Sequence, residues 1–140
     1  MLKEIQVNKR LKRLYLMDEN YNVYAEFPIG TEFYEGHNDN DEPFSNADNG
    51  VYSLNRVDID YPRDVSAAYG YAYINIDERG RAIHGGGTNL GYVGATEPYQ
   101  SDLLPTYGCF RMYNAQVLFV AQEAVHARDN GVDVVIHVVE

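Results

Sequence analysis

The sequence contains no tryptophan and one cysteine, and its 11 lysine and arginine residues are outnumbered by 21 aspartate and glutamate residues. A single cysteine excludes an internal disulfide, so cysteine pairing says nothing about the redox compartment. The formal net charge of −10 argues against nucleic acids and anionic membrane surfaces as partners, because both attract basic patches. The chain also lacks an apolar stretch long enough to span a membrane as a helix.

Signals for export, metal ions and cofactors are missing as well. Residues 1–5 lead into an alternating segment with no apolar run and no small-residue cleavage site, so no secretory signal is recognisable. Four dispersed histidines and one cysteine lack the spacing of metal ligands, so we expect no metal site and no cofactor. Residues 30–50 are acidic and rich in asparagine, but they do not follow the spacing of an EF-hand calcium loop. We therefore interpret them as a solvated loop.

What the chain does have is enough length for one domain, residues 1–140, and 13 tyrosines, which suit half-buried strands. Alternation and turn residues predict a largely β structure. The predicted strands are 10–17 and 23–29, which form a hairpin around 18–22, then 51–57, 67–76, 81–84 and 132–139. The clearest strand places Tyr69, Tyr71 and Tyr73 on one face. The valine-rich last strand predicts burial on both faces, whereas residues 3–7 alternate only weakly.

One principal helix is predicted over residues 115–129. Asn114 is a suitable N-cap, and an Asn-Gly pair at residues 130–131 supplies the stop. Apolar side chains at helical spacing form a stripe along this segment, made of Val117, Leu118, Ala121, Ala124 and Val125. A second, short helix is expected near residues 99–103. The predicted fold class is therefore mainly β, a mixed α+β domain with one principal helix.

The only cysteine stands in the stretch Gly108-Cys109-Phe110-Arg111. The glycine lets the backbone approach a ligand closely, and the arginine can bind a carboxylate through two parallel hydrogen bonds. The predicted helix begins a few residues later, and the positive end of its dipole favours a thiolate. Upstream, a predicted strand ends at His84, followed by three glycines that lack the Lys-Ser/Thr ending of a phosphate loop. A lone cysteine with a histidine elsewhere is the pairing that a thiolate nucleophile and its base require.

A structural interpretation of the same residue types stays open. A single cysteine in a globular domain is most often a small buried hydrophobe, and a lone histidine is most often structural. His37 lies in the acidic loop, His126 in the predicted helix and His137 in the last strand, and none of them belongs to a recognisable constellation. Two roles are open for Arg111, which either orients a substrate or pairs with an acidic loop residue.

His84-Gly85, a glycine-rich interval and then Thr106-Tyr107-Gly108-Cys109-Phe110-Arg111 resemble the signature of the L,D-transpeptidase (YkuD-like) catalytic domain. That signature runs His-Gly, an interval, Ser/Thr-His-Gly-Cys, an aliphatic residue and usually Arg. The positions that match it are His84, Gly85, Thr106, Gly108, Cys109 and Arg111. Tyr107 departs from it, because the family usually has a second histidine there. The interval before Cys109 is also longer than is typical.

The resemblance implies a fold and a set of roles. The fold is an L,D-transpeptidase-like β-sandwich or mixed sheet with one principal helix. Cys109 is then the nucleophile and His84 its base, with the imidazole held by the Gly85 carbonyl. The resemblance places the oxyanion donors at the backbone N–H groups of Tyr107, Gly108 and Cys109. It places the substrate-binding residues at Arg111, Gly86 and Thr106.

The resemblance also implies a substrate. Peptidoglycan stem peptides would be attacked through a cysteine thioester, giving a 3→3 crosslink or the release or exchange of a D-amino acid. Two alternatives stay open: an L,D-carboxypeptidase or endopeptidase that hydrolyses stem peptides, and a catalytically weak peptidoglycan-binding relative, because Tyr107 replaces the usual histidine. The expected location is the cell envelope or periplasm. Without a recognisable signal, we expect a mature fragment, a phage-encoded protein or a secreted effector.

Overall fold

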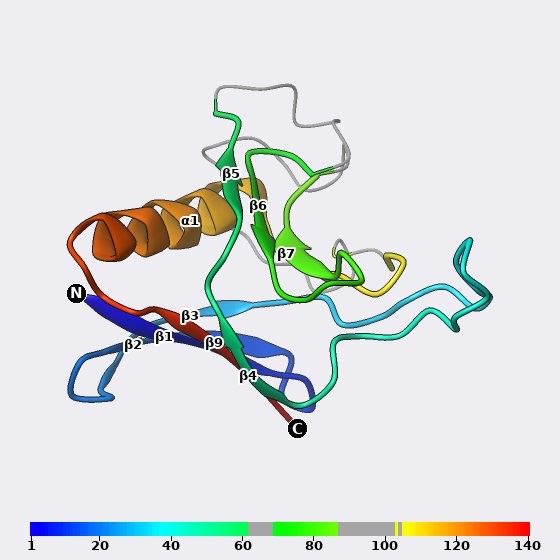
Figure 1. The fold of residues 1–140 in the computed structure, drawn as a ribbon, viewed down its shortest axis with the longest axis horizontal. Coiled ribbons are helices and arrows are strands. Elements are labelled where there is room, and N and C mark those ends of the chain that lie inside the picture. The colour runs from blue at the N-terminus through cyan, green and yellow to red at the C-terminus, as the bar shows by residue number, and fades with distance from the viewer. Residues whose placement is uncertain (62–68, 87–102, 104) are drawn as a thin grey trace.

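The computed structural model describes residues 1–61, 69–86, 103 and 105–140, which form two sheets and the helix α1 (Figure 1). The first sheet has the order β3-β2-β1-β9-β4, with β1 (Leu2–Asn8), β2 (Arg13–Asp18), β3 (Val23–Pro28), β4 (Gly50–Ser53) and β9 (Val135–Val139). The second sheet has the order β5-β6-β7-β8, with β5 (Val57–Ile59), β6 (Ala72–Asn75), β7 (Ala82–His84) and β8 (Phe110–Arg111). This is the mainly β fold class with one principal helix that the sequence predicts.

Side chains in the first sheet alternate between the core and the outer face. Strand β1 buries Ile5 and Val7 completely, and it pairs antiparallel with β2 and parallel with β9. It is therefore the central strand, although its sequence alternates only weakly. In β9, Ile136 and Val138 are buried while their neighbours are partly exposed. The predicted burial of the last strand on both faces is wrong, because α1 and the second sheet lie on the same side of it (Figure 1).

The predicted hairpin around residues 18–22 is confirmed by the antiparallel pairing of β2 and β3. Asp18 Oδ1 closes its turn by accepting hydrogen bonds from the backbone N–H groups of Asn20 and Asn22, at 2.9 and 3.0 Å. The strand predicted over 51–57 is divided in the structure. Its beginning is part of β4 in the first sheet, and its end starts β5 in the second.

The strand predicted over 67–76 is shorter than expected, because Gly70, with a φ of +62°, lies in a turn just before β6. The ring of Tyr69 packs on that of Tyr73, with centroids 4.8 Å apart. Tyr71 instead packs on a different tyrosine ring, 5.1 Å away. The predicted single face of three tyrosines is therefore wrong, since the turn directs Tyr71 elsewhere.

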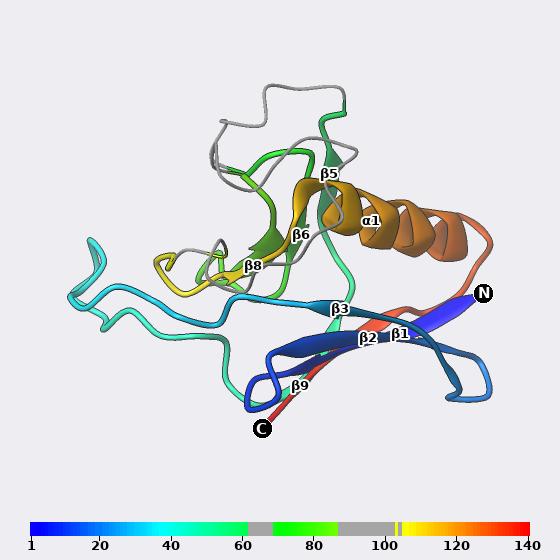
Figure 2. The same cartoon turned by 180° about the vertical axis from the view of Figure 1, so that it is seen from behind.

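Helix α1 (Asn114–Asp129) agrees with the predicted segment and packs against β5 and β6 of one sheet and β1 of the other (Figure 2). Because both sheets cover it, its buried side is wider than the predicted stripe. The buried apolar residues are Val117, Leu118, Val120, Ala121, Ala124 and Ala127. Val125 is only partly buried. The N-cap is Tyr113 rather than the predicted Asn114, whose side chain serves a different purpose described below.

Parts of two predictions lie outside the described residues. They are the first two residues of the strand predicted over 67–76 and, apart from Leu103, the short helix predicted near 99–103. In the described part of the chain, no helix is long and apolar enough to cross a membrane.

Candidate active site

The parallel pairing of β7 and β8 brings the predicted base and nucleophile into one pocket. Ile83 is paired with Phe110, and both are completely buried in the core. Because side chains alternate along a strand, His84, Cys109 and Arg111 face the opposite side. There they line a pocket of about 500 Å³, which we call the Cys109 pocket. Its other lining residues are Tyr34, Asn38, Phe44, Tyr69, Arg79, Gly80, Arg81, Pro105, Thr106 and Tyr107.

His84 is held in one tautomer. Its Nδ1 lies 2.5 Å from the carbonyl oxygen of Gly85. A carbonyl only accepts hydrogen bonds, so Nδ1 carries the proton and Nε2 keeps its lone pair. His84 is 4% exposed, and its ring centroid lies 5.0 Å from that of Tyr69 and 6.5 Å from that of Tyr73.

Burial sets the charge of His84. Burial lowers the pKa of His84 to about 4; the hydrogen bond to Gly85 acts against this shift, and the charge of Arg111 adds to it. The imidazole is therefore neutral at neutral pH. A neutral ring with a free Nε2 can accept a proton, which is what a general base must do.

The Cys109 thiol lies in a different environment from the one its sequence predicts. Burial raises the pKa of Cys109, and the negative charge of Asp77 adds to this effect. A backbone hydrogen bond from Ala82 and the charges of Arg111 and Arg81 lower the pKa in part. The sequence predicted that the start of the helix favours a thiolate. In the structure, α1 begins only at Asn114, after β8, and burial has the largest effect on the pKa of Cys109. The resting cysteine is therefore a thiol.

The turn that presents Cys109 is closed by the Thr106 hydroxyl. Thr106 Oγ1 donates to the Cys109 carbonyl over 2.7 Å and accepts from the Gly108 N–H over 3.1 Å. The Gly108 N–H and the Thr106 hydroxyl are therefore bonded to each other in this structure, and the predicted roles of Gly108 toward an oxyanion and of Thr106 toward a substrate stay predictions. Gly108 has a φ of +124°, and a Cβ there would overlap the Ser45 carbonyl. Only glycine fits at this position.

Arg81 connects the walls of the pocket, a role that the sequence did not reveal. Its side chain is buried, and its Nε lies 2.6 Å from Asp77 Oδ2. Its Nη1 donates to Ser45 Oγ over 3.0 Å and to the Asn46 carbonyl over 2.9 Å. Asp77 also accepts hydrogen bonds from the backbone N–H groups of Arg79 and Arg81, which close the turn at 77–80. Arg81 thus holds this turn and residues 45–46 against the turn of Gly108.

Arg111 is the cation in the pocket that has no acidic partner among the described residues. Arg79 lies 3.3 Å from Glu42, and Arg81 pairs with Asp77. The half-buried Arg111 makes no ion pair in the described part of the chain, and its buried Nε has no hydrogen-bond partner there. Burial lowers its pKa. Of the two roles left open for Arg111, pairing with an acidic loop residue is not observed among the residues that the structure describes.

Asn114 joins the start of α1 to the strand that carries His84. Its Oδ1 accepts the backbone N–H of Gly86 over 3.0 Å and that of Tyr71 over 3.4 Å. A Cβ on Gly85 would overlap this side chain, so the glycine permits the close approach. Gly86 does not line the Cys109 pocket, and its N–H faces Asn114. The predicted contact of Gly86 with substrate stays a prediction.

The loop predicted over residues 30–50 is a wall of the pocket rather than only a solvated connection. Gly30 exchanges backbone hydrogen bonds with Arg111, and the Tyr34 N–H donates to the Thr106 carbonyl over 2.9 Å. The second bond places Tyr34 beside the nucleophile turn, and the ring of Phe44 packs on Tyr107 of the same turn. The remaining histidines lie elsewhere: His37 and His126 are exposed, and His137 Nδ1 lies 3.4 Å from a carboxylate oxygen of β1.

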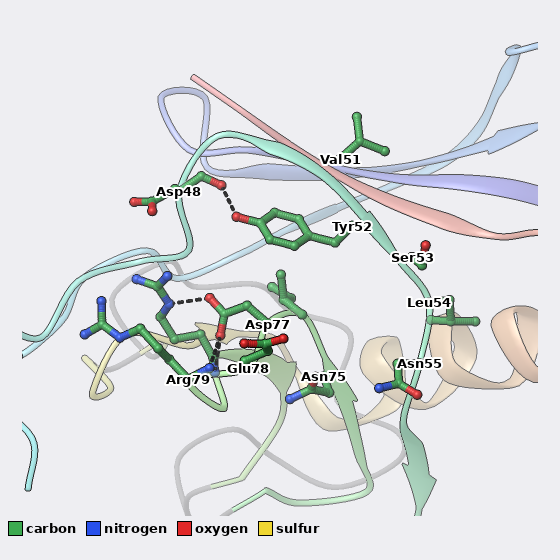
Figure 3. Close-up of a pocket in the computed structure, with 12 residues that line it drawn as sticks. Asp48, Val51, Tyr52, Ser53, Leu54, Asn55, Asn75, Asp77, Glu78 and Arg79 are labelled. Carbon is green, nitrogen blue, oxygen red and sulfur yellow. Dashed lines mark hydrogen bonds and ion pairs between the residues drawn. The ribbon is translucent and has the colours of Figure 1, made fainter. Parts of the chain in front are cut away.

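A larger hollow of about 750 Å³ is lined by residues of the turn at 77–80 (Figure 3). It extends from that turn to β4, where the Tyr52 hydroxyl donates to the Asp48 carbonyl over 2.7 Å. Asn55, Asn75 and Glu78 also line it, but no histidine or cysteine does. Of the Cys109 pocket and this hollow, only the Cys109 pocket has both a cysteine and a histidine among its described lining residues.

Comparison with solved structures identifies the fold. The catalytic domain of an Enterococcus faecium L,D-transpeptidase matches with a TM-score of 0.59 and 14% identity over 97% of this chain and 95% of that domain. The helical cell shape determining protein Pgp2 of Campylobacter jejuni matches with a TM-score of 0.60, 17% identity and 98% of this chain. An L,D-transpeptidase of Xylanimonas cellulosilytica matches with a TM-score of 0.57, 12% identity and 97% of this chain.

These matches show that the chain has the fold of L,D-transpeptidase (YkuD-like) catalytic domains, as its motif predicted. The chain spans 59% of the Xylanimonas structure and 46% of the Campylobacter one. No family model matches the sequence. No curated protein matches it either.

Proposed function

We propose that this chain is an L,D-transpeptidase-like cysteine enzyme that acts on peptidoglycan stem peptides in the cell envelope. One observation carries the proposal. In the L,D-transpeptidase fold, an imidazole with Nδ1 fixed by the Gly85 carbonyl lines the same pocket as the only thiol of the chain. A nucleophile, a base and a group that orients the base are the three parts that covalent acyl transfer needs.

The first half of the reaction forms a thioester. Cys109 Sγ attacks the carbonyl carbon of the L-centred diamino acid while His84 Nε2 takes the thiol proton. The oxyanion is stabilised by backbone N–H groups of the turn, for which Tyr107 and Cys109 remain the proposed donors. When the C–N bond breaks, His84 returns the proton to the departing amine of the terminal D-amino acid. A neutral imidazole beside a protonated thiol favours this general-base route over a preformed ion pair.

The second half decides the product. The amine of a second stem peptide, or of a free D-amino acid, attacks the thioester carbonyl while His84 takes its proton, and Cys109 leaves as the thiolate and is reprotonated. This gives a 3→3 crosslink or an exchanged D-amino acid. If water attacks instead, the same steps give the carboxylic acid, and the enzyme is an L,D-carboxypeptidase or endopeptidase.

Arg111 is the proposed anchor for a carboxylate of the substrate. The described residues that line the Cys109 pocket include three arginines and no aspartate or glutamate, in a chain of net charge −10. Two of these arginines are neutralised by their own partners, which leaves Arg111. Stem peptides carry carboxylates near the scissile bond, and a guanidinium can bind one through two parallel hydrogen bonds.

A catalytically weak, peptide-binding relative is the second candidate. The Tyr107 side chain, in the position of the usual histidine, is 68% exposed and packs on Tyr34 and Phe44, so it supplies no second base. Burial also raises the pKa of Cys109. Both features favour slow acylation.

The deciding experiment is incubation with disaccharide tetrapeptides, followed by mass spectrometry of the products. Loss of the terminal D-amino acid, with or without crosslinked dimers, would support the enzyme and separate hydrolysis from transfer. The adduct formed with a carbapenem or a thiol reagent would be measured in parallel, with Cys109→Ser as the control. Bound but unaltered tetrapeptide, together with an inert thiol, would support the binding protein.

A further inference from the structure

Three aromatic side chains form a row at the mouth of the Cys109 pocket. Tyr107 lies in the middle, and its ring centroid is 5.2 Å from that of Tyr34 and 5.0 Å from that of Phe44. The plane of the Tyr107 ring is tilted by 49° to that of Tyr34 and by 51° to that of Phe44. We call these three residues the aromatic rim. Although the rings touch, Tyr34 remains 47% exposed and Tyr107 68% exposed, so ring surface is left for a ligand.

The rim is built on anchored backbone rather than on a free loop. The Tyr34 N–H donates to the Thr106 carbonyl over 2.9 Å, and the Phe44 N–H donates to the Gly36 carbonyl over 2.9 Å. Tyr107 itself belongs to the turn that presents Cys109. The ring positions are therefore coupled to the nucleophile turn, and little ordering is needed when a ligand binds.

The chemistry of the rim is amphipathic and uncharged. The hydroxyl groups of Tyr34 and Tyr107 make no hydrogen bond within the described residues, nor does that of Tyr69, which is 49% exposed on the pocket wall. A purely apolar partner would remove water from these hydroxyls without replacing its hydrogen bonds, which is unfavourable. A ligand that covers the ring faces and also offers hydroxyl or amide groups would bury the apolar ring surface and form hydrogen bonds with the tyrosine hydroxyls.

We propose that the aromatic rim binds a neutral sugar ring of the glycan strand that carries the stem peptide. The electron-rich face of an aromatic ring attracts the C–H groups of a pyranose, while hydroxyl and acetamido groups can bond to the tyrosine hydroxyls. The identity of the sugar's source rests on the proposed function, but saccharide binding by the rim does not depend on catalysis.

The length of the stem peptide fits this arrangement. The scissile carbonyl belongs to the third residue of the stem, so the sugar would lie roughly 10 Å away along an extended chain. That distance places the sugar outside the floor of the pocket and on the surrounding surface, where the rim lies. The pocket would then recognise the peptide, and the rim would select peptides that are still attached to glycan.

The test is an NMR titration with chitotetraose, a peptide-free oligomer of N-acetylglucosamine. It compares the wild type with Cys109→Ala, Tyr34→Leu and Tyr24→Leu. Tyr24 is the matched control, because it is a tyrosine of similar exposure, 42%, that lies on β3 and does not line the pocket. Its hydroxyl donates a hydrogen bond to Glu123. We expect saturable shift changes at the aromatic rim in the wild type and in Cys109→Ala. Tyr34→Leu should weaken binding at least ten-fold, and Tyr24→Leu should stay within two-fold.

Three outcomes would overturn the proposal: no saturable change in the wild type, equal affinity in Tyr34→Leu, or rim shifts with free tetrapeptide but not with the saccharide. Because Cys109→Ala cannot form a thioester, saccharide binding in that variant separates this inference from the proposed function. If the protein acts on stem peptides but does not bind the saccharide, only the proposal for the aromatic rim is refuted. A saccharide-binding protein with an inert thiol would refute the catalytic proposal alone.

Discussion

The two sheets of this molecule differ in what holds them together. The first sheet has strands of four to seven residues whose buried and exposed side chains alternate. The second has strands of two to four residues, and specific bonds from Asn114, Arg81 and Thr106 fix the segments beside it. Both sheets bury side chains in the core, and the second sheet also positions His84 and Cys109. We therefore expect substitutions of buried residues in the first sheet to reduce stability, and substitutions of the pocket residues beside the second sheet to reduce chemistry.

The largest effect should come from Cys109→Ala. No other group in the described part of the pocket can supply a thiolate, so acylation and product formation should both be abolished. The lost side chain is small and only partly buried, so the free energy of unfolding should change by less than about 1 kcal/mol. Mass spectrometry of the acyl adduct and urea denaturation measure the two quantities. Product formation by this variant would exclude Cys109 as the nucleophile.

His84→Ala should lower the acylation rate by roughly two to four powers of ten at neutral pH, the usual contribution of a positioned base. That corresponds to about 3 to 5 kcal/mol of barrier. The rate should partly return at high pH, where the thiol ionises without help, and peptide affinity should change little. His126→Ala, on the exposed side of α1, is the control. Parallel pH profiles with equal rates for His84→Ala and the wild type would remove His84 from the mechanism.

Ile136→Ala tests the expected role of the first sheet in stability. Ile136 is completely buried in β9 between β1 and β4. Its truncation should cost about 2 to 5 kcal/mol of unfolding free energy. The acylation rate per folded molecule should stay within two-fold, because the second sheet is unaltered. Val51→Ala, in exposed β4, should change stability by less than about 0.5 kcal/mol. A large loss of rate in folded Ile136→Ala would show that the two sheets are not separable.

Acid should weaken the fold through His84. Its folded pKa of about 4 lies below its ordinary value of 6.5, so the unfolded chain binds this proton first as the pH falls. The free energy of unfolding should therefore decrease between pH 6.5 and 4 by at most about 3 kcal/mol, with no further contribution from His84 below that window. The difference in urea unfolding between the wild type and His84→Gln isolates this term, and His126→Gln is the control. An identical pH dependence in wild type and His84→Gln would contradict the buried, neutral imidazole.

The smallest effect is expected from Tyr107→His. The exposed ring lies outside the second sheet, and the proposed role of the residue in catalysis is its backbone N–H. Turnover should rise or stay unchanged, because the substitution restores the residue usual in the family beside an intact Gly108-Cys109. Steady-state rates on a tetrapeptide measure this. A ten-fold loss, about 1.4 kcal/mol of barrier, would show that the phenol itself takes part in the reaction.

Local patterns in the sequence were sufficient for several elements. The helix predicted over 115–129 and the hairpin around residues 18–22 depend on neighbours within a few positions, so spacing and turn residues predicted them. The motif around Cys109 also predicted that the Gly85 carbonyl would hold His84, a contact between adjacent residues that the structure contains.

Elements that depend on distant partners were predicted poorly. Residues 2–8 form the central strand only because β2 and β9 cover both of its edges. The turn at Gly70, where a Cβ would overlap the side chain of the distant Asn114, shortened the strand predicted over 67–76. The loop over 30–50 became a pocket wall because its backbone pairs with Thr106 and Arg111.

The amino-acid sequence by itself determined which groups are available for chemistry: one thiol, one histidine followed by glycine, and an arginine two residues after the thiol. Only the tertiary structure decided their state. The parallel register of β7 and β8 placed them on one face, burial made the imidazole neutral and kept the thiol protonated, and Thr106 occupied the Gly108 N–H. The reason is physical: chemical identity is local, whereas desolvation and hydrogen-bond partners depend on atoms that only folding brings close.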